Sequence, residues 1–312
     1  MQKKALIIGS EGQDGQLLAK LLYKKNYKLF SIINKNIVKN DSYKITKKKV
    51  NIFDEKKLKK YFQSKKFDEI YFLPIKNINP EEKVNNSIDE YNFQLNTLGL
   101  TNVLENIKLI KSVKFFYASS SYIYENAQIS INEKNKFSPQ NFYGLSKLLG
   151  MQICDYYRVK YSLFLNVGIL FSHTSSLSGK KYLIYKIVYQ FVRQKNKKLI
   201  IIKVGNSKQK IQLLAAEDVV NAMHSSMKLA RSDNFIISGE KIYNIKQLII
   251  EIGKLIAPSA KINIIENKKI LKNNKDGKSL IGDSKKIRQK CNWVEQIKFK
   301  DLIHEMVKLH DH

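Results

Sequence analysis

The sequence predicts an α/β protein whose core is a doubly wound parallel sheet, with a smaller, interleaved C-terminal domain. Three observations support this fold class. Short apolar runs of strand length alternate with helical patterns through the first 170 residues. A turn with three glycines joins the first of these runs to the first helical pattern. Beyond residue 171 the alternation loosens and mostly helical patterns remain. Strands that alternate with helices at this spacing are typical of a parallel sheet covered on both faces.

The first 170 residues supply the strands and helices of the expected sheet. The strands are expected at Ala5–Ile8, Lys28–Ile33, Val50–Phe53, Glu69–Leu73, Val113–Ala118 and Ser162–Leu170. The helices between them are expected at Gln16–Tyr23, Glu55–Gln63, Glu90–Asn106 and Tyr143–Tyr161. Residues 1–170, with parts of 200–235, therefore form the first domain in this prediction.

Four further helices are expected in residues 171–312, which we assign to the second domain. They are Tyr182–Gln194, Ala216–Leu229, Ile245–Leu255 and Phe299–Leu309. No clear linker separates the two halves of the chain, so we expect the second domain to interleave with the first.

The composition is that of a globular protein, because hydrophobic residues make up 43% of the chain. The formal net charge is +29, yet only four of the 56 basic residues are arginine, and the lysines are spread along the whole length. Surfaces that bind a phosphate backbone favour arginine. We therefore expect solvated lysines, which can steer an anionic small substrate, and no nucleic-acid partner.

Cysteine and histidine usage argues against disulfides and metal sites. Cys154, Cys291 and the five histidines show no metal-ligand spacing. The longest apolar stretches fall short of the roughly 20 residues that a membrane helix needs. The first strand begins almost at Met1, which leaves no room for a signal peptide. These features predict a cytoplasmic protein that holds no metal and does not enter a membrane.

The glycine turn predicts a dinucleotide ligand. Gly9, Gly12 and Gly15 lie between the first strand and the first helix, in the stretch Ile-Ile-Gly-Ser-Glu-Gly-Gln-Asp-Gly. Glycine allows positive φ and lets backbone N–H groups approach a pyrophosphate at the helix N-terminus. In a doubly wound sheet, this turn is the usual dinucleotide-binding position.

The end of the second strand bears on which dinucleotide binds. An acidic residue there would bind the adenosine ribose hydroxyls and favour NAD. Here the strand ends with Ile33-Asn34-Lys35-Asn36. The Lys35 ammonium suits a 2′-phosphate, and the alternative is that Lys35 is one more surface lysine. The sequence favours NADP, with NAD left open.

A second group of residues suggests acid–base chemistry on an alcohol. Ala-Ser-Ser-Ser-Tyr closes the fifth expected strand at Ala118–Tyr122, and Tyr-Gly-Leu-Ser-Lys begins the next long helix at Tyr143. Tyr143 and Lys147 are four residues apart, so they share a helix face. A nearby ammonium lowers the pKa of a phenol, which makes Tyr143 a candidate general acid/base, with Ser120 bound to the same substrate oxygen.

Together with Asn96-Thr97-Leu98-Gly99 in the preceding long helix, these motifs resemble those of the extended short-chain dehydrogenase/reductases that act on nucleotide sugars. Within this group the chain is most similar to the GDP-mannose 4,6-dehydratases, whose glycine turn also ends in Gln-Asp-Gly. Further similar stretches are Glu69–Leu73, Val167–His173, Gly282–Trp293 and His304–Val307.

The resemblance implies a Rossmann-type cofactor domain, a substrate domain and an internal redox cycle. The cofactor takes a hydride from C4 of the hexose, water leaves from C5 and C6, and the hydride returns at C6. Ser120, Tyr143 and Lys147 match the family's catalytic residues. Its cofactor-binding residues are matched by Gly9, Gly12, Gln13, Asp14, Gly15 and Asn96.

The same resemblance implies the partners of the chain. The substrate would be a nucleotide sugar, most simply a GDP-linked hexose, and His173 would line the sugar site. The chain would form a homodimer or homotetramer, with the helices at Glu90–Asn106 and Tyr143–Tyr161 in the contact.

The chain departs from the family pattern at residues that dehydration needs. The family's Thr-Ser-Glu supplies the glutamate that removes the C5 proton, whereas here Ser120-Ser121 is followed by Tyr122. A neutral phenol is a poor replacement for a carboxylate base. Glu125 lies three residues further on, and we treat Ser121, Tyr122 and Glu125 as candidate substrate contacts. The family's arginine-rich loop corresponds to Thr174–Lys180, which has no arginine.

Three functions remain open at this point. The first is a dehydratase of the GDP-mannose type with an altered base. The second is a nucleotide-sugar reductase, 4-epimerase or dehydrogenase, which needs Ser120, Tyr143 and Lys147 but no glutamate. The third is a dinucleotide-binding subunit with reduced catalysis.

Overall fold

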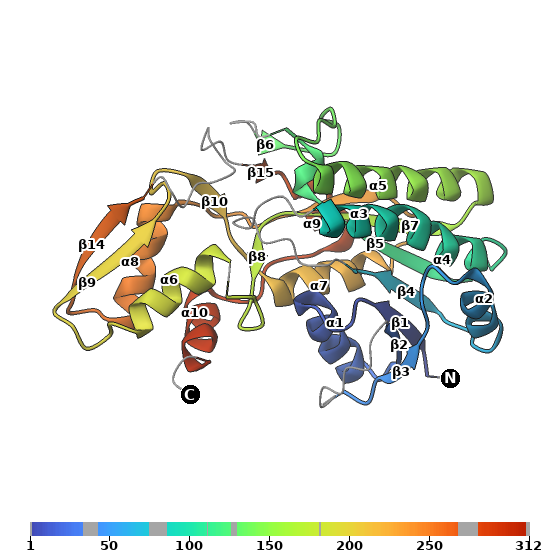
Figure 1. Ribbon diagram of the computed structural model, residues 1–312, viewed down its shortest axis with the longest axis horizontal. Helices are drawn as coiled ribbons and strands as arrows, with labels where there is room; N and C mark the ends of the chain where they lie inside the picture. Colours follow the sequence, from blue (N-terminus) through green and yellow to red (C-terminus); the bar gives the residue numbers. More distant parts are fainter. Residues whose placement is uncertain are drawn as a thin grey trace.

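The computed structural model describes residues 2–33, 43–74, 86–110, 112–125, 130–180, 182–267 and 280–309. Within these ranges, seven parallel strands form a central sheet in the order β12-β7-β5-β4-β1-β2-β3 (Figure 1). The strands are β1 (Lys4–Ile8), β2 (Lys28–Ile33), β3 (Thr46–Lys49), β4 (Glu69–Phe72), β5 (Lys114–Ser120), β7 (Phe164–Leu170) and β12 (Asn234–Ile237). The strand order reverses between β1 and β4, where doubly wound sheets bind ligands at the strands' carboxyl ends. The predicted fold class is confirmed.

Helices cover both faces of this sheet (Figure 1). Ala5 and Ile7 of β1 point into an apolar cluster under one layer of helices, and Leu6 and Ile8 point into a second cluster under the other. This alternation is the geometry of a strand buried on both sides. The first layer comprises α1 (Gln13–Lys24), α7 (Ala216–Ser226) and α9 (Lys285–Cys291). The second comprises α2 (Glu55–Gln63), α3 (Asn86–Gln94), α4 (Leu100–Ile107) and α5 (Phe142–Tyr161).

The helix expected at Glu90–Asn106 is observed as three consecutive segments. α3 continues into a π-helical segment, η1 (Leu95–Gly99), and then into α4. A π segment is a local widening of the helix that is frequent at functional sites. Here it carries Asn96, whose side chain is fully buried.

A second unit lies beside the sheet (Figure 1, left). It has its own apolar cluster, which includes Phe191, Ile200 and Ile252. Its helices are α6 (Leu183–Val192), α8 (Ile245–Ile256) and α10 (Phe299–Lys308), and its parallel strand pair is β9 (Leu199–Val204) and β14 (Lys261–Glu266). The chain leaves the sheet after β7, returns to it through α7 and β12, and enters the second unit again at α8.

Short strand pairs and one turn of 3-10 helix complete the described structure. The pairs are β8 (His173–Thr174) with β11 (Leu214–Ala215), β10 (Lys210–Gln212) with β13 (Ile242–Asn244), and β6 (Ser130–Ile131) with β15 (Ile281–Gly282). The 3-10 turn, η2 (Ser121–Ile123), follows β5 directly.

One predicted strand is wrong. The sequence placed the third strand at Val50–Phe53, whereas the structure places β3 at Thr46–Lys49. β3 lies at the edge of the sheet and its lysines are largely exposed, as is common for edge strands. Val50 and Ile52 follow the strand and are buried in the cluster beneath α2 and α4. Their apolar character therefore indicates burial in this cluster and not pairing in the sheet.

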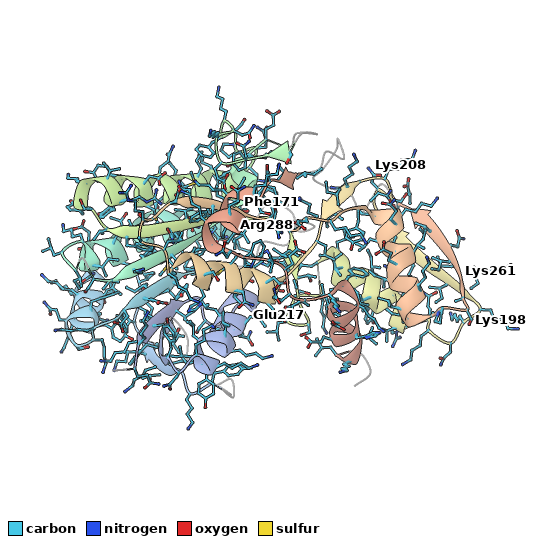
Figure 2. The ribbon with its side chains drawn as sticks, turned by 180° about the vertical axis from the view of Figure 1, so that it is seen from behind. Phe171, Lys198, Lys208, Glu217, Lys261 and Arg288 are labelled. Carbon is cyan, nitrogen blue, oxygen red and sulfur yellow. The ribbon has the colours of Figure 1, made fainter. Side chains whose placement is uncertain are left out.

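The lysines are distributed as expected from the sequence. Figure 2 labels Lys198, Lys208 and Lys261, which are exposed on the second unit, with Lys198 and Lys261 at the end that is remote from the sheet. Within the described ranges, no helix has the length and apolar character required to cross a bilayer.

Candidate active site

Two positions of the glycine turn accept only glycine, because a side chain there would collide with the backbone. Gly9 has φ +93°, and a Cβ there would lie 2.9 Å from the backbone of Leu73 and Pro74. A Cβ on Gly15 would lie 2.2 Å from the Gly9 carbonyl oxygen. A larger residue at Gly15 would push α1 away from the end of β1, and one at Gly9 would collide with the segment after β4.

Gly12 serves a different purpose, because a Cβ on it would meet only the Gly9 carbonyl oxygen, at 3.6 Å. Gly12 is the N-cap of α1 and supplies no side-chain acceptor to the N–H groups of the first turn. As in every α-helix, the N–H groups of the first turn have no hydrogen-bond partner within the helix. The open space and the exposed donors at a helix N-terminus fit an anionic diphosphate.

Ser120 and Tyr143 are brought together by a close approach of α5 to η2. A Cβ on Gly144 would lie 2.1 Å from the Tyr122 carbonyl oxygen, so only glycine allows this contact. Asn141 caps α5, its Oδ1 accepting from the Gly144 N–H at 2.7 Å. The Ser120 side chain acts on the Tyr143 hydroxyl and opposes the rise of its pKa, so the two groups lie near each other.

Lys147 is buried, with 3% of its surface exposed. Its Nζ donates to the Ala118 carbonyl oxygen at 2.9 Å and lies 5.2 Å from the centre of the Tyr117 ring. Burial lowers the pKa of Lys147 to about 7, and the charge of Asp14 acts in the opposite direction. Burial raises the pKa of Tyr143, and the Ser120 side chain only partly opposes this rise. This rise is opposite to the shift expected from a nearby ammonium alone.

Asp14 connects the glycine turn to the acid–base residues. Its carboxylate acts electrostatically on Lys147, on Tyr143 and on Tyr182. Both of its oxygens lie 3.1 Å from Nε2 of His173, a residue that the sequence predicts at the sugar site. The turn, the Ser-Tyr-Lys group and the segment after β7 therefore converge at one edge of the sheet.

Asn96, predicted as a cofactor contact, lies beneath this site. Its Oδ1 accepts from the Tyr117 hydroxyl at 2.9 Å, and its Nδ2 donates to the Asn92 carbonyl oxygen at 2.8 Å and approaches Ser146 Oγ at 3.5 Å. These contacts join η1, β5 and α5. Asn96 thus supports the helix face that bears Lys147.

The candidate substrate contacts Ser121, Tyr122 and Glu125 differ in exposure and in the residues they contact. Tyr122, on η2, is 47% exposed and its ring contacts that of Tyr143, with centroids 5.8 Å apart. Burial of the hydroxyl raises the pKa of Tyr122. Ser121 is buried, and its carbonyl oxygen accepts from Tyr124 N at 3.0 Å. Glu125 is exposed and is not among the groups that act most strongly on Tyr143. Lys35 lies outside the described residues.

Two residues at the site were missed from the sequence. Tyr182 is the N-cap residue of α6, and Asp14 and Tyr122 both act on its hydroxyl. Ser175 donates through Oγ to Gln13 Oε1 at 3.0 Å. No sequence pattern marks these two residues as part of the site. They reach the turn only through the tertiary fold.

A doubly wound sheet with a glycine turn at β1–α1, a serine at the end of β5 and Tyr-x-x-x-Lys on α5 defines the extended short-chain dehydrogenase/reductases. The resemblance inferred from the sequence is confirmed at this level. A family model described as GDP-mannose 4,6 dehydratase matches residues 6–306, and the chain belongs to that family.

Curated relatives agree with this assignment. The chain is 29% identical to GDP-mannose 4,6 dehydratase of Cricetulus griseus, covering 98% of this chain and 91% of the relative. It is 28% identical to the human protein of the same name, covering 97% and 90% of the two chains.

Solved structures share the fold. UDP-glucose 4-epimerase of Thermotoga maritima, solved with UDP-glucose, superposes with TM-score 0.84 at 15% identity and 99% and 98% coverage. RMD from Pseudomonas aeruginosa, complexed with NADPH, gives 0.79 at 17% identity and 99% and 97% coverage. dTDP-glucose 4,6-dehydratase of Bacillus anthracis, in complex with NAD, gives 0.79 at 16% identity and 99% and 96% coverage. Family and turn geometry together support a nicotinamide dinucleotide as the cofactor.

Proposed function

We propose that the protein is an NADP-dependent nucleotide-sugar enzyme that oxidises C4 of a GDP-linked hexose in a reaction of the 4,6-dehydratase type. The observation that carries this proposal is the position of Asp14. This residue belongs to the glycine turn and acts on both Tyr143 and Lys147, so the dinucleotide turn and the acid–base residues face the same space. Such convergence is what hydride transfer beside a proton transfer requires.

The protein's own residues would handle the proton of the C4 hydroxyl. Bound at the glycine turn, the nicotinamide cofactor supplies a hydride acceptor for C4 and a later hydride donor. Tyr143 would take the O4 proton as the C4–H bond breaks, and Ser120 would hold the same oxygen. Tyr143 must be ionised for this step, and its pKa is raised by burial in the described structure. Lys147 lies on the same helix face and would favour the phenolate in its charged form, which burial disfavours and Asp14 favours.

The preference for NADP rests on lysines near the end of β2. Lys35 follows this strand directly in the sequence. Lys47 of the neighbouring strand β3 lies beside the turn, with Nζ 3.5 Å from Glu11 Oε1. Ammonium groups in this region suit the 2′-phosphate that distinguishes NADP from NAD. Weaker binding of NADH than of NADPH, with a smaller difference in Lys35→Ala, would support the choice.

The substrate side is assigned to the second unit and the segment that leads to it. We place the sugar nucleotide between residues 171–182 and the sheet edge, with residues 1–170 and part of 200–235 as the cofactor domain. Thr174 Oγ1 and Ser178 Oγ are buried without a hydrogen-bond partner in the described part of the chain. Buried hydroxyls that lack protein partners are suited to a polar ligand.

A second function is favoured by Tyr122. This residue stands where the family has the base that removes the C5 proton, and burial raises its pKa, so it stays neutral and accepts no proton. Without a base, oxidation at C4 can still proceed and be reversed from either face of the sugar. The products would then be those of a reductase, a dehydrogenase or a 4-epimerase.

One incubation separates these functions. Purified protein is mixed with GDP-mannose and a catalytic amount of NADP, and the products are analysed by mass spectrometry and by absorbance of the reduced cofactor. A 4-keto-6-deoxy product without net cofactor change supports the dehydratase. Net reduction of the cofactor, or an epimer of unchanged mass, supports the redox reaction alone. Tight cofactor binding without turnover of any nucleotide sugar would leave only a binding subunit.

The quaternary structure and location follow from the same proposal. We propose a homodimer or homotetramer built on η1, α4 and α5, whose outer face carries a shallow depression of about 310 Å³. We also place the protein in the cytoplasm, since Cys154 and Cys291 are both free thiols.

A further inference from the structure

The residues Gln13 and Asp14 of the glycine turn are bonded to two residues of the segment after β7. Asp14 contacts His173 Nε2 through both oxygens, at 3.1 Å each. Gln13 accepts from Ser175 Oγ at 3.0 Å and donates to Asp14 Oδ1 at 3.1 Å. Ser175 Oγ in turn accepts from the Leu177 N–H at 3.1 Å. We call this set of four side chains, Gln13, Asp14, His173 and Ser175, the latch.

The hydrogen-bond geometry requires that His173 donates from both ring nitrogens. Its Nδ1 lies 2.7 Å from the Phe171 carbonyl oxygen, and its Nε2 faces the Asp14 carboxylate. A carbonyl oxygen and a carboxylate both accept, so the two contacts are satisfied together by the imidazolium. Phe171, labelled in Figure 2, lies at the side of the sheet that faces the second unit.

The ion pair is well shielded from solvent. The His173 and Asp14 side chains are 16% and 19% exposed. Burial alone would lower the pKa of His173, but the charge and hydrogen bond of Asp14 raise it to about 9. Burial would raise the pKa of Asp14, and His173 reverses that shift. The other titratable groups that face the pair are Lys147, Tyr143 and Tyr182.

Charge explains why this pair matters at this position. Asp14 lies in the first turn of α1, at the end of the helix where the anionic diphosphate would bind. An uncompensated carboxylate there would repel the diphosphate, because unit charges a few ångströms apart interact strongly when water is excluded. The His173 imidazolium cancels this charge, while the N–H groups of the first turn of α1, which have no intrahelical partner, can bind the ligand.

We propose that the Asp14–His173 ion pair, braced by Gln13 and Ser175, is a positioning device that lets an acidic residue occupy the diphosphate-binding turn. It fixes the turn to the segment carrying Tyr182, so the cofactor and sugar parts of the site hold one geometry. The catalytic part of this inference rests on the proposed function, whereas its charge-compensation part concerns only dinucleotide binding.

The test compares NADPH affinity, by fluorescence titration at pH 8, for His173→Gln and for the double variant Asp14→Asn/His173→Gln. In His173→Gln the carboxylate is left unpaired, and affinity should fall by about 10–30-fold. In the double variant the charge is gone, and affinity should recover to within about 3-fold of the unmodified protein. A purely structural role would make the double variant no better than the single one. His304→Gln and Asp301→Asn are the matched controls, because both residues are exposed on α10 and Asp301 also lies in a helix first turn.

A second readout needs no ligand. Nitrogen NMR of the His173 ring at pH 7.5 should show both nitrogens protonated in the unmodified protein and a mostly neutral ring in Asp14→Asn. Unchanged NADPH affinity in His173→Gln, a double variant as weak as the single one, or a neutral His173 ring in the unmodified protein would each overturn the latch. If instead NADPH binds as expected but no nucleotide sugar is turned over, the proposed function fails and the latch stands.

Discussion

At the scale of single residues, the site combines an intact Ser-Tyr-Lys group with an unusual neighbour. The ring of Tyr122 contacts that of Tyr143, with centroids 5.8 Å apart, and under the proposed function Tyr122 stands in place of the family's carboxylate. The burial that raises the pKa of both phenols disfavours charge in this part of the site. Among the described groups that shift the pKa of Tyr143, the only carboxylate is Asp14, whose effect is the smallest and which is already paired with His173. Under the proposed function, the described residues therefore supply the groups for C4 oxidation but no carboxylate placed for C5 deprotonation.

Replacing Tyr122 should change the product and not the first step. Tyr122→Glu restores the family's carboxylate and should increase the yield of 4-keto-6-deoxy product from GDP-mannose, measured by mass spectrometry as loss of one water. Tyr122→Phe is the control, and it should leave C4 oxidation within about 3-fold of the unmodified rate because the O4 proton is assigned to Tyr143. A strong loss in Tyr122→Phe would show that this hydroxyl takes part in the chemistry.

Removing the Tyr143 hydroxyl should abolish the proton transfer and spare binding. Tyr143→Phe is expected to lower kcat by about 10²–10⁴-fold, the usual contribution of a positioned acid/base. NADPH affinity should remain unchanged, since the glycine turn is untouched. Equal losses in affinity and turnover would contradict the assigned role.

His173 should make stability depend on pH. Its pKa is raised above the ordinary value of 6.5 to about 9, so the stabilisation is complete below 6.5 and is lost as the pH rises through about 9. Compared with His173→Gln, the unmodified protein should be more stable at pH 6 by at most about 3 kcal/mol, and this difference should vanish by about pH 10. Urea unfolding at several pH values measures it, and a constant difference would argue that the ring only fills space.

At the scale of elements, the start of α5 positions the acid–base residues. Gly144 allows the helix to approach the Tyr122 carbonyl oxygen, and Asn141 caps the helix one residue before Phe142. Asn96, in the π segment η1, supports the same helix from below through Tyr117 and Ser146. Local chain geometry thus sets where Tyr143 and Lys147 point.

The Gly144 contact makes a direct prediction. In Gly144→Ala the added Cβ would lie 2.1 Å from a backbone oxygen, which forces α5 or η2 to move. We expect a loss of about 1–3 kcal/mol in the free energy of unfolding, typical of overpacking, together with a lower kcat. Gly179→Ala is the control for stability, because its Cβ would meet only the Tyr182 ring, at 3.5 Å. Equal losses of stability in the two variants would contradict the proposed tight contact.

The outer face of α5 should be an oligomer contact. Val159 is 81% exposed on this helix, and Tyr156 beside it is 53% exposed and lines the shallow depression. Apolar side chains gathered on one helix face favour association. In sedimentation velocity, Val159→Asp should shift the dimer toward monomer, while Val294→Asp, at another exposed valine, should not. A monomeric unmodified protein would exclude this interface.

At the scale of the whole molecule, the sheet was predictable from sequence because its strands are apolar on both faces and its helices are amphipathic. β2, α2 and α5 were predicted to within one residue of their observed bounds. β3 was not, because an edge strand with exposed lysines lacks the apolar signal. Strands β9 and β14 were missed because β9 alternates between exposed and buried residues, and β14 is mostly exposed.

The site was predictable only where function imposes local spacing. The three glycines of the turn are separated by short, fixed intervals, and so are Tyr143 and Lys147. These spacings can be recognised in the sequence. Asp14 and His173 are separated by 159 positions, and only the fold brings their side chains to 3.1 Å. The upward pKa shift of Tyr143 also depends on burial, which no local pattern reports. Tertiary contacts therefore decide the electrostatics of this site.

The central claim is that the glycine turn and the Ser120, Tyr143 and Lys147 group together move a hydride from C4 of a GDP-linked hexose. Isotope transfer from GDP-mannose deuterated at C4, followed by NMR and mass spectrometry of sugar and cofactor, tests it most directly. We predict that the deuterium leaves C4 and is found in the reduced cofactor or at C6 of the product, and that Tyr143→Phe stops this transfer. Deuterium that remains entirely at C4 of sugar that has not been epimerised, in protein that binds NADPH, would contradict the account.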